Sequence, residues 1–293
     1  MGKVFILASD TESPQLSNSL KPMKTLFSCL PAVILATSAQ GALTSFTDNF
    51  DSYTAGEPIT SPWTYGDSAA TSTQQVTQIS PGNLGYTQTL TGSGSGYITT
   101  SLGSGSDFVM SVRFRMDALS GGSGGSATMN QSLSALGNNV SASSGSAYRL
   151  SYVPIVSDDV IQNYGRLILS EPGSTGIAGT LTSADRYILP ESDVGASARF
   201  YTLRLTGTYA DGSLTLLGAL LDDTDTVLLT VDGTDASPLA GEYFGLRFAS
   251  NSSLNTGTVT YDDFGVIAVP EPAAAGLAGI GLLGLLLRRP ARR

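Results

Sequence analysis

The side chains that most often carry out chemistry are nearly missing from this sequence. It contains no histidine and a single cysteine, Cys29. Histidine is the commonest general base and the commonest transition-metal ligand, so its absence removes both at once. Serine triads, cysteine-histidine pairs and zinc sites are therefore excluded. The chemistry that remains belongs to carboxylates, hydroxyls and amides.

Carboxylates are plentiful between Leu43 and Val269, but they are not paired for catalysis. Asp223 and Asp225 have an i, i+2 spacing, yet they lie in an expected turn, where Asp is common for conformational reasons. Hard oxygen ligands make calcium the metal that this composition favours. The only glutamates of this body lie too far apart for any two to share a strand: Glu57, Glu171, Glu191 and Glu242.

The charge of the body excludes one class of partner. Residues 43 to 269 contain 17 Asp and 4 Glu against 8 Arg and no Lys, a net charge of −13. No basic surface is left to neutralise phosphates, so nucleic acid is excluded as a partner. Charged residues make up only 13% of the whole chain, which also has 34 glycines. Strong helix formers are scarce, and this favours short strands and turns.

Period-two alternation supplies the elements that must position any site. "DFVMSVRFRM", from Asp107 to Met116, places apolar residues on one face and two arginines on the other, as in a half-buried strand. "RFYTLRLTGTY" (199–209) repeats this design, and "SLTLLGALLDDTDTVLLTV" (213–231) indicates two strands joined by a turn. The pattern predicts an all-β antiparallel β-sandwich over residues 43–268, with the Gly-Ser stretch 92–96 as a loop.

The first 42 residues have the layout of a targeting segment. From Met23 the chain reads "MKTLFSCLPAVILATSAQGA", a lysine followed by an apolar run and small residues. This predicts a secretory signal peptide over 23–42, with residues 1–22 as an upstream extension that is not part of the natural protein. A buried N-terminal helix is the alternative, and Pro31 counts against it because proline interrupts a helix.

The other end of the chain reads "VPEPAAAGLAGIGLLGLLLRRPARR". Prolines hold its first residues extended. Residues 273–287 would form a helix of roughly 22 Å, short of the ~30 Å hydrocarbon core of a bilayer. The arginines that follow are expected on the cytoplasmic side. The residues of the predicted signal are Val269, Pro270, Glu271, Pro272, Arg288, Arg289, Arg292 and Arg293.

These three parts in this order resemble the PEP-CTERM sorting signal of Gram-negative bacteria that make exopolysaccharide. The resemblance covers residues 269–293. It implies an exosortase-type membrane protease as partner, transient residence of the transmembrane helix in the inner membrane, and delivery to the cell surface or extracellular matrix. An ordinary tail anchor is the alternative.

A second resemblance lies in the body. "FTDNFDSYTAGEPI…PW" (46–63) near the start and "LAGEYFGLRF…VTYDDFGV" (239–266) at the end resemble the first and last strands of concanavalin A-like lectin/glucanase (LamG-like) jelly rolls. This implies two curved antiparallel sheets, in many members a glycan-binding face, and in some a structural calcium ion. Enzymatic members carry an E-x-D-x-E or E-x-D-x-x-E strand, which places two carboxylates at ~5 to 5.5 Å for retaining hydrolysis. No such motif occurs here.

The jelly-roll resemblance also suggests where calcium and glycans would bind. Its terminal strands lie side by side, which would bring Asp48 or Asp51 to Asp262 or Asp263 as calcium ligands. The alternative is that these aspartates are ordinary strand-end residues. Aromatic platforms for a glycan would come from Trp63 and Tyr65. Here the alternative is that Trp63 belongs to the core.

Two classes of function follow. The first is a noncatalytic exported protein of the cell surface or extracellular matrix that binds a polysaccharide. The second is an exported carbohydrate-active hydrolase with an unconventional Asp-based site. The missing histidine and the unpaired glutamates favour the first.

Overall fold

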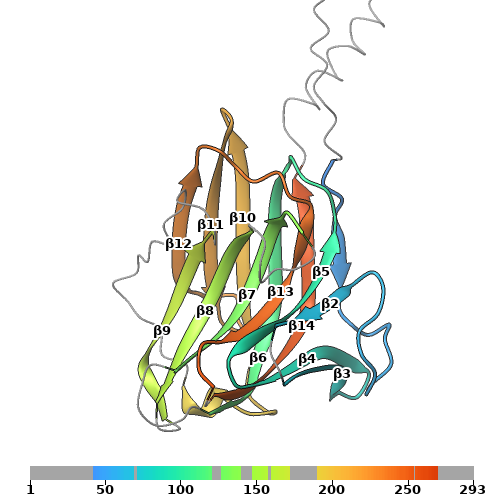
Figure 1. Cartoon of the computed structure of the whole chain (residues 1–293), viewed down its shortest axis with the longest axis vertical. Coiled ribbons are helices and arrows are strands. Elements are labelled where there is room, and N and C mark those ends of the chain that lie inside the picture. Colours follow the sequence, from blue (N-terminus) through green and yellow to red (C-terminus); the bar gives the residue numbers. More distant parts are fainter. Residues whose placement is uncertain are drawn as a thin grey trace, which may run out of the picture. The chain divides into compact units, whose positions relative to one another are not determined.

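A computed structural model describes residues 42–68, 71–120, 127–139, 147–157, 160–171, 190–253 and 255–269. Its strands form two sheets (Figure 1), and within each sheet all pairs of neighbouring strands are antiparallel. The predicted all-β sandwich is therefore confirmed. Both predicted targeting segments lie outside the described residues, apart from Ala42 and Val269.

The larger sheet has eight strands. Seven follow one another in space, and the short β1 (Phe46–Asp48) pairs with β14 off this path. In spatial order the seven are β12 (Val227–Asp235), β11 (Ser213–Leu221), β10 (Tyr201–Ala210), β6 (Asp107–Ser120), β14 (Thr256–Val269), β4 (Asn83–Thr91) and β3 (Ser72–Ser80).

The smaller sheet has six strands. In spatial order they are β2 (Thr64–Asp67), β5 (Gly94–Ser101), β13 (Tyr243–Ser250), β7 (Ala127–Gly137), β8 (Tyr148–Ser157) and β9 (Val160–Ser170). A short 3-10 helix, η1 (Glu191–Asp193), precedes β10.

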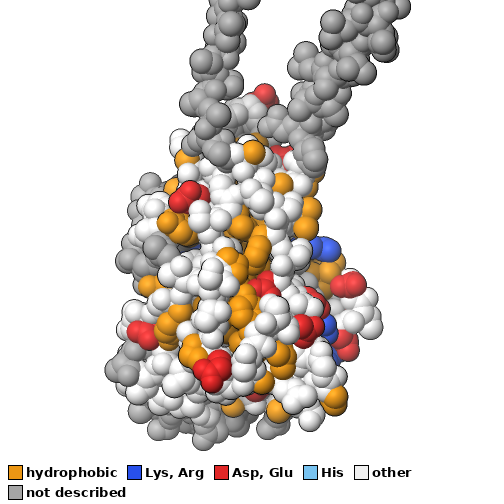
Figure 2. All heavy atoms as spheres, turned by 90° about the vertical axis from the view of Figure 1, so that its right-hand side faces the viewer, with side chains coloured by type: hydrophobic (Ala, Val, Ile, Leu, Met, Phe, Trp, Pro, Cys, Tyr) orange, Lys and Arg blue, Asp and Glu red, His pale blue; other side chains and the backbone are white. Residues whose placement is uncertain are grey.

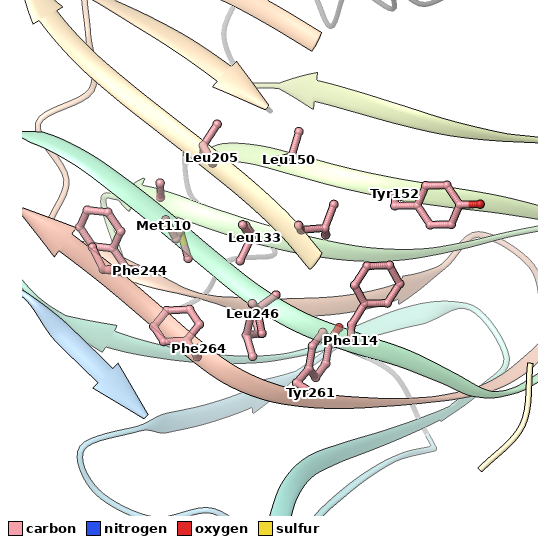
Figure 3. Close-up of a cluster of buried hydrophobic side chains, with 14 of the residues drawn as sticks. Met110, Phe114, Leu133, Leu150, Tyr152, Leu205, Phe244, Leu246, Tyr261 and Phe264 are labelled. Carbon is pink, nitrogen blue, oxygen red and sulfur yellow. The ribbon is translucent and has the colours of Figure 1, made fainter. Parts of the chain in front are cut away.

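Alternation along β6 shows why these residues form a sandwich. Phe108, Met110, Val112, Phe114 and Met116 are at most 1% exposed, as period two predicts for a strand with one face on the core. Their side chains meet those of the six-stranded sheet in one continuous cluster. In Figure 3 the rings of Phe114 and Tyr152 lie next to each other, with centroids 6.2 Å apart.

One predicted loop is instead part of a strand. Gly94, Ser95 and Gly96 open β5, whereas the Gly-Ser composition of 92–96 indicated a loop. The reason is tertiary packing, because a Cβ on Gly96 would lie 1.8 Å from the amide nitrogen of Gln88 on the opposite sheet. Glycine is needed here for a close approach between the two sheets.

Candidate functional site

A hollow of about 510 Å³ opens where three loops meet at one end of the sandwich. The loops follow β5, follow β7 and precede β13. This volume lies within the range of pockets that hold small ligands. We call it the loop hollow, and its lining residues are Gly103, Ser104, Asn138, Leu239, Ala240, Gly241 and Glu242.

Backbone contacts hold these loops together. The amide of Leu102, just past β5, donates a 2.9 Å hydrogen bond to the carbonyl of Glu242. The loop before β13 also presses directly on the end of β7, because a Cβ on Gly241 would lie 2.2 Å from the carbonyl oxygens of Leu136 and Gly137. Only glycine fits at this close approach.

A buried tyrosine supports the wall of the loop hollow. The hydroxyl of Tyr148 donates to Oδ2 of Asp235 over 2.7 Å and accepts a 2.9 Å hydrogen bond from the amide of Leu239. Oδ1 of Asp235 accepts from the amide of Ser237 over 2.8 Å. Burial and the neighbouring Asp235 carboxylate raise the pKa of Tyr148, so its hydroxyl stays a neutral donor. This network fixes the course of the chain from Asp235 to Leu239.

The polar groups of the loop hollow suit hydrogen bonding more than bond cleavage. The side chains of Asn138 and Glu242 are exposed, and neither has a hydrogen-bond or ion-pair partner in the described part of the chain. A carboxylate accepts hydrogen bonds, while an amide both donates and accepts them. Glu242 is the only carboxylate among the described lining residues, and hydrolysis of a glycosidic bond ordinarily requires two.

The aspartates predicted to bind calcium lie on β14 and on β1 with the turn that follows it. β1 pairs with β14, and Asp48 lies opposite Phe264. The predicted neighbourhood of the terminal strands is therefore present. Asp48 and Asp263 line a shared hollow of about 560 Å³. Among the described residues, however, no group of three or more His, Cys, Asp or Glu side chains is arranged to hold a metal ion.

Asp48 and Asp51 already use their oxygens as acceptors. Oδ1 of Asp48 accepts from the amide of Phe50 over 2.8 Å. Oδ2 of Asp48 accepts from the hydroxyl of Tyr53 over 2.8 Å and from Nε1 of Trp63 over 2.7 Å. Asp51 accepts the amide of Leu84 over 2.7 Å. These bonds fasten the segment after β1 to the sandwich.

Asp262 and Asp263 face an arginine. Nη1 of Arg113 lies 3.5 Å from Oδ2 of Asp262 and 3.0 Å from Oδ2 of Asp263. Burial, and then the charge of Asp263, raises the pKa of Asp262, which is only 2% exposed. Protein donors thus contact the carboxylates of Asp48, Asp51 and Asp262, and Arg113 lies against Asp262 and Asp263. These contacts compete with a calcium ion, and calcium binding through the four aspartates stays a prediction.

The aromatic residues predicted to bind glycans lie against the core. Trp63 is 5% exposed, and its ring packs on Phe264 with centroids 4.9 Å apart. This burial matches the core-packing alternative. Tyr65 is half-buried, and its hydroxyl donates to Asp67 over 2.9 Å and lies 3.0 Å from the Ser72 hydroxyl. Neither ring presents an open platform in this arrangement.

Asp223 and Asp225 lie in the predicted turn, between β11 and β12. Nη1 of Arg199 lies 3.6 Å from Asp223, and Asp225 has a φ of 61°. This backbone conformation is common for Asp in turns.

Sequence analysis did not identify the loop hollow and only counted Glu242 among the glutamates of the body. Its lining residues come from three distant parts of the chain, and only the fold brings them together. The local signal was Gly241, a glycine two residues before β13.

No helix among the described residues is long and apolar enough to cross a membrane. The predicted sorting helix, 273–287, lies outside them.

Comparisons with known proteins place the chain in no family. No protein-family model matches it, and neither does any curated protein sequence. Solved structures with a similar arrangement include peanut lectin bound to a 9-residue peptide, at 14% identity and a TM-score of 0.42, covering 78% of this chain and 99% of that one. The CBM2 module of the evolved Dit of Lactobacillus casei BL23 phage J-1 has 11% identity and a TM-score of 0.48, with coverages of 78% and 99%.

Lectin II from Ulex europaeus has 12% identity and a TM-score of 0.42, with coverages of 77% and 98%. Scores and identities this low do not establish a family. The two-sheet antiparallel sandwich is therefore assigned from the strand pairing itself.

Proposed function

We propose that this protein is a noncatalytic glycan-binding protein of the cell surface or extracellular matrix. A signal peptide would export it, and an exosortase-type protease would process its C-terminal sorting signal. The sandwich would then serve as a binding module, with the loop hollow as the place where sugar residues are held.

The observation that carries this proposal is the composition of the loop hollow. An exposed carboxylate, Glu242, and an exposed amide, Asn138, converge there with the backbone of Gly103 and Gly241. Neighbouring hydroxyls of a sugar can donate to a carboxylate while they accept from an amide. The Tyr148 network keeps one wall in place, so little ordering has to accompany binding.

The same composition supports a noncatalytic role. A single carboxylate among the described lining residues cannot act as both acid and base or nucleophile in the usual manner of glycosidases. Asp223 and Asp225, the pair that sequence analysis considered for catalysis, lie in an exposed turn.

The delivery part of the proposal rests on the two ends of the sequence. The last strand, β14, ends at Val269, and Pro270 follows it directly. The proposed sorting signal would thus begin where the sandwich ends. In this position a protease could remove the tail without cutting a strand.

Affinity electrophoresis of the protein through gels containing neutral or acidic polysaccharides tests the binding proposal. Glu242→Gln and Asn138→Ala should each weaken retardation by about tenfold, the effect of losing a hydrogen bond to a charged or well-placed group. Asp232→Asn, an exposed carboxylate on β12, is the matched control and should change nothing. Retardation by none of the polysaccharides, or equal retardation of all variants, would contradict glycan binding in the loop hollow.

A further inference from the structure

A second hollow opens on the outward side of the eight-stranded sheet, where β1 runs beside β14. Its volume of about 560 Å³ lies within the range of pockets that hold small ligands. Phe264 and Val266 of β14 belong to the core cluster, so the residues that alternate with them face outward. We call this feature the second hollow. Its lining includes Thr47, Ser111, Asp263, Gly265 and Ile267.

Gly265 lies at the centre of the second hollow. Strand pairing places it opposite Thr47 of β1 on one side and opposite Ser111 of β6 on the other. Along β14 itself, Asp263 lies two residues before Gly265, and Ile267 lies two residues after it. Four side chains thus surround a position that has none.

Neither packing nor backbone conformation requires glycine at this position. Apart from its chain neighbours, a Cβ on Gly265 would meet only Cγ2 of Thr47 at 3.7 Å and Oγ of Ser111 at 3.9 Å. These are ordinary contact distances. The positive φ at the nearby β-bulge, 48°, belongs to Asp263 and not to Gly265.

Other glycines of the same sheet have a structural reason. A Cβ on Gly207 would lie 2.3 Å from the ring of Phe108, and a Cβ on Gly218 would lie 2.3 Å from Leu150 of the opposite sheet. Glycine inside a strand lowers stability relative to alanine, and it often marks the close approach of a ligand. Because no such contact explains Gly265, we take its effect to be an open floor in the second hollow.

The polar groups around this floor are free to bond. In the described part of the chain, the hydroxyls of Thr47 and Ser111 have no hydrogen-bond partner. Oδ2 of Asp263 lies 3.0 Å from Nη1 of Arg113, and its Oδ1 has no partner there either. Thr47 and Asp263 are exposed, and Ser111 is half-buried. Two groups that both donate and accept thus lie beside one that accepts.

Ile267 adds an apolar wall. Its side chain is 47% exposed, which is unusual for a large aliphatic residue on this protein. Binding sites for small ligands typically combine apolar surface with a few well-placed polar groups. A sugar ring has the matching character, because C–H groups cover its faces and hydroxyls surround its rim.

The charges beside the second hollow favour an uncharged ligand. Arg113 contacts both Asp262 and Asp263, and Arg204 lies opposite Ser111 on the next strand. With Asp48, which also lines the hollow, three aspartates face two arginines. On the face shown in Figure 2, the few blue side chains likewise lie beside red ones. No excess of positive charge is left to attract an acidic polymer.

We propose that the second hollow binds one sugar residue of a neutral polysaccharide, seated over Gly265. Thr47, Ser111 and Oδ1 of Asp263 would bond to its hydroxyls, while Ile267 would cover an apolar face of the ring. This inference goes beyond the loop hollow by adding a second place of contact, and it rests on the proposed glycan binding. Two sites on one molecule would strengthen binding to a polymer through their combined effect.

Filling the second hollow tests the inference. The protein is run through gels that contain dextran, galactomannan, xylan or polygalacturonic acid. Gly265→Leu places a side chain where the ring would lie, and we expect it to weaken retardation by the best neutral polymer at least tenfold. Thr230→Leu is the matched control, because Thr230 is exposed at the far edge of the same sheet, on β12. It should change nothing.

Removing single hydroxyls gives a second measurement that does not depend on a larger side chain. Ser111→Ala and Thr47→Ala should each weaken retardation roughly fivefold, the effect of one lost hydrogen bond. Thr230→Ala should leave it unchanged. Thermal melting checks the fold, and Gly265→Ala should melt at or above the temperature of wild type, because it removes no contact. If Gly265→Leu does not fold, the two hydroxyl variants carry the test.

The outcomes separate this inference from the proposed function. Retardation that falls in Glu242→Gln but not in Gly265→Leu, Ser111→Ala or Thr47→Ala would overturn the second site and leave the loop hollow intact. The reverse pattern would support the second site and contradict the loop hollow. Retardation by polygalacturonic acid alone would overturn the assignment of a neutral polymer, and retardation by no polymer would overturn both proposals.

Discussion

The indole of Trp63 donates a hydrogen bond of 2.7 Å to Oδ2 of Asp48, fifteen residues earlier in the chain. The same carboxylate accepts from Tyr53 and Phe50. Asp48, which was predicted to bind calcium, and Trp63, which was predicted to bind a glycan, thus contact each other. Together they hold the segment after β1 on the core.

Asp48→Ala should therefore destabilise the fold. Three donors would lose their acceptor, and we expect the free energy of unfolding to fall by about 3 kcal/mol. Asp48→Asn keeps the shape of the side chain and should cost about 1 kcal/mol. Trp63 is the only tryptophan of the chain, so a red shift of its fluorescence in Asp48→Ala would report the loosened segment directly.

Calcium provides the control for this prediction. If Asp48 serves only these contacts, wild-type protein should melt at the same temperature in calcium and in chelator. A calcium-dependent rise that disappears in Asp263→Ala would instead support the metal site predicted from the sequence.

Asp262 should make stability depend on pH. Its pKa is raised in the folded protein above the ordinary 3.8, so the folded state binds its proton more tightly than the unfolded chain does. Stability contributed by this group is therefore lost as pH rises from about 3.8 through the raised pKa. Asp262→Asn should be more stable than wild type at pH 7 and should lose this advantage below about pH 4.

Asp232→Asn is the matched control, because Asp232 is exposed on β12, which three strands separate from β14 in the sheet. Its melting temperature should follow that of wild type across the same range. A constant difference between Asp262→Asn and wild type at all pH values would contradict the assigned cause.

A buried amide between the sheets should be replaceable with a gain in stability. Gln131 is fully buried, and neither its amide nitrogen nor its amide oxygen has a hydrogen-bond partner in the described chain. Gln131→Met keeps the volume and removes the unsatisfied groups, so we expect a gain of about 1–2 kcal/mol in urea unfolding. Gln75→Met, at an exposed position of β3, should change stability by less than about 0.5 kcal/mol. A loss of stability in Gln131→Met would show that the amide is satisfied in solution.

The proposed C-terminal sorting signal leads to a prediction about the mature protein. Surface protein from the native host should end near Pro270, and replacing Pro270, Glu271 and Pro272 with alanines should leave the tail attached. Mass spectrometry of the C-terminal peptide measures this. Peptides that reach Leu287 in the mature pool would show a permanent anchor instead.

The elements were more predictable than the site because they depend on local pattern. Alternation in β6 and β10 was visible in the sequence because each strand has one face on the core. The strand at Gly94 to Gly96 was not, because Gly96 is required by its close approach to Gln88 on the other sheet. Likewise Asn138 and Glu242 come together only through the folding of distant loops.

The most direct test of the central claim is to mix the protein with the polysaccharide that retards it most in gels and to measure both binding and cleavage. Sedimentation gives the bound fraction, and a reducing-sugar assay counts newly formed chain ends. We predict that wild-type protein sediments with the polymer, that Glu242→Gln sediments far less, and that no new reducing ends appear. New reducing ends that depend on the protein, or sedimentation unaffected by Glu242→Gln, would contradict a noncatalytic glycan-binding role centred on the loop hollow.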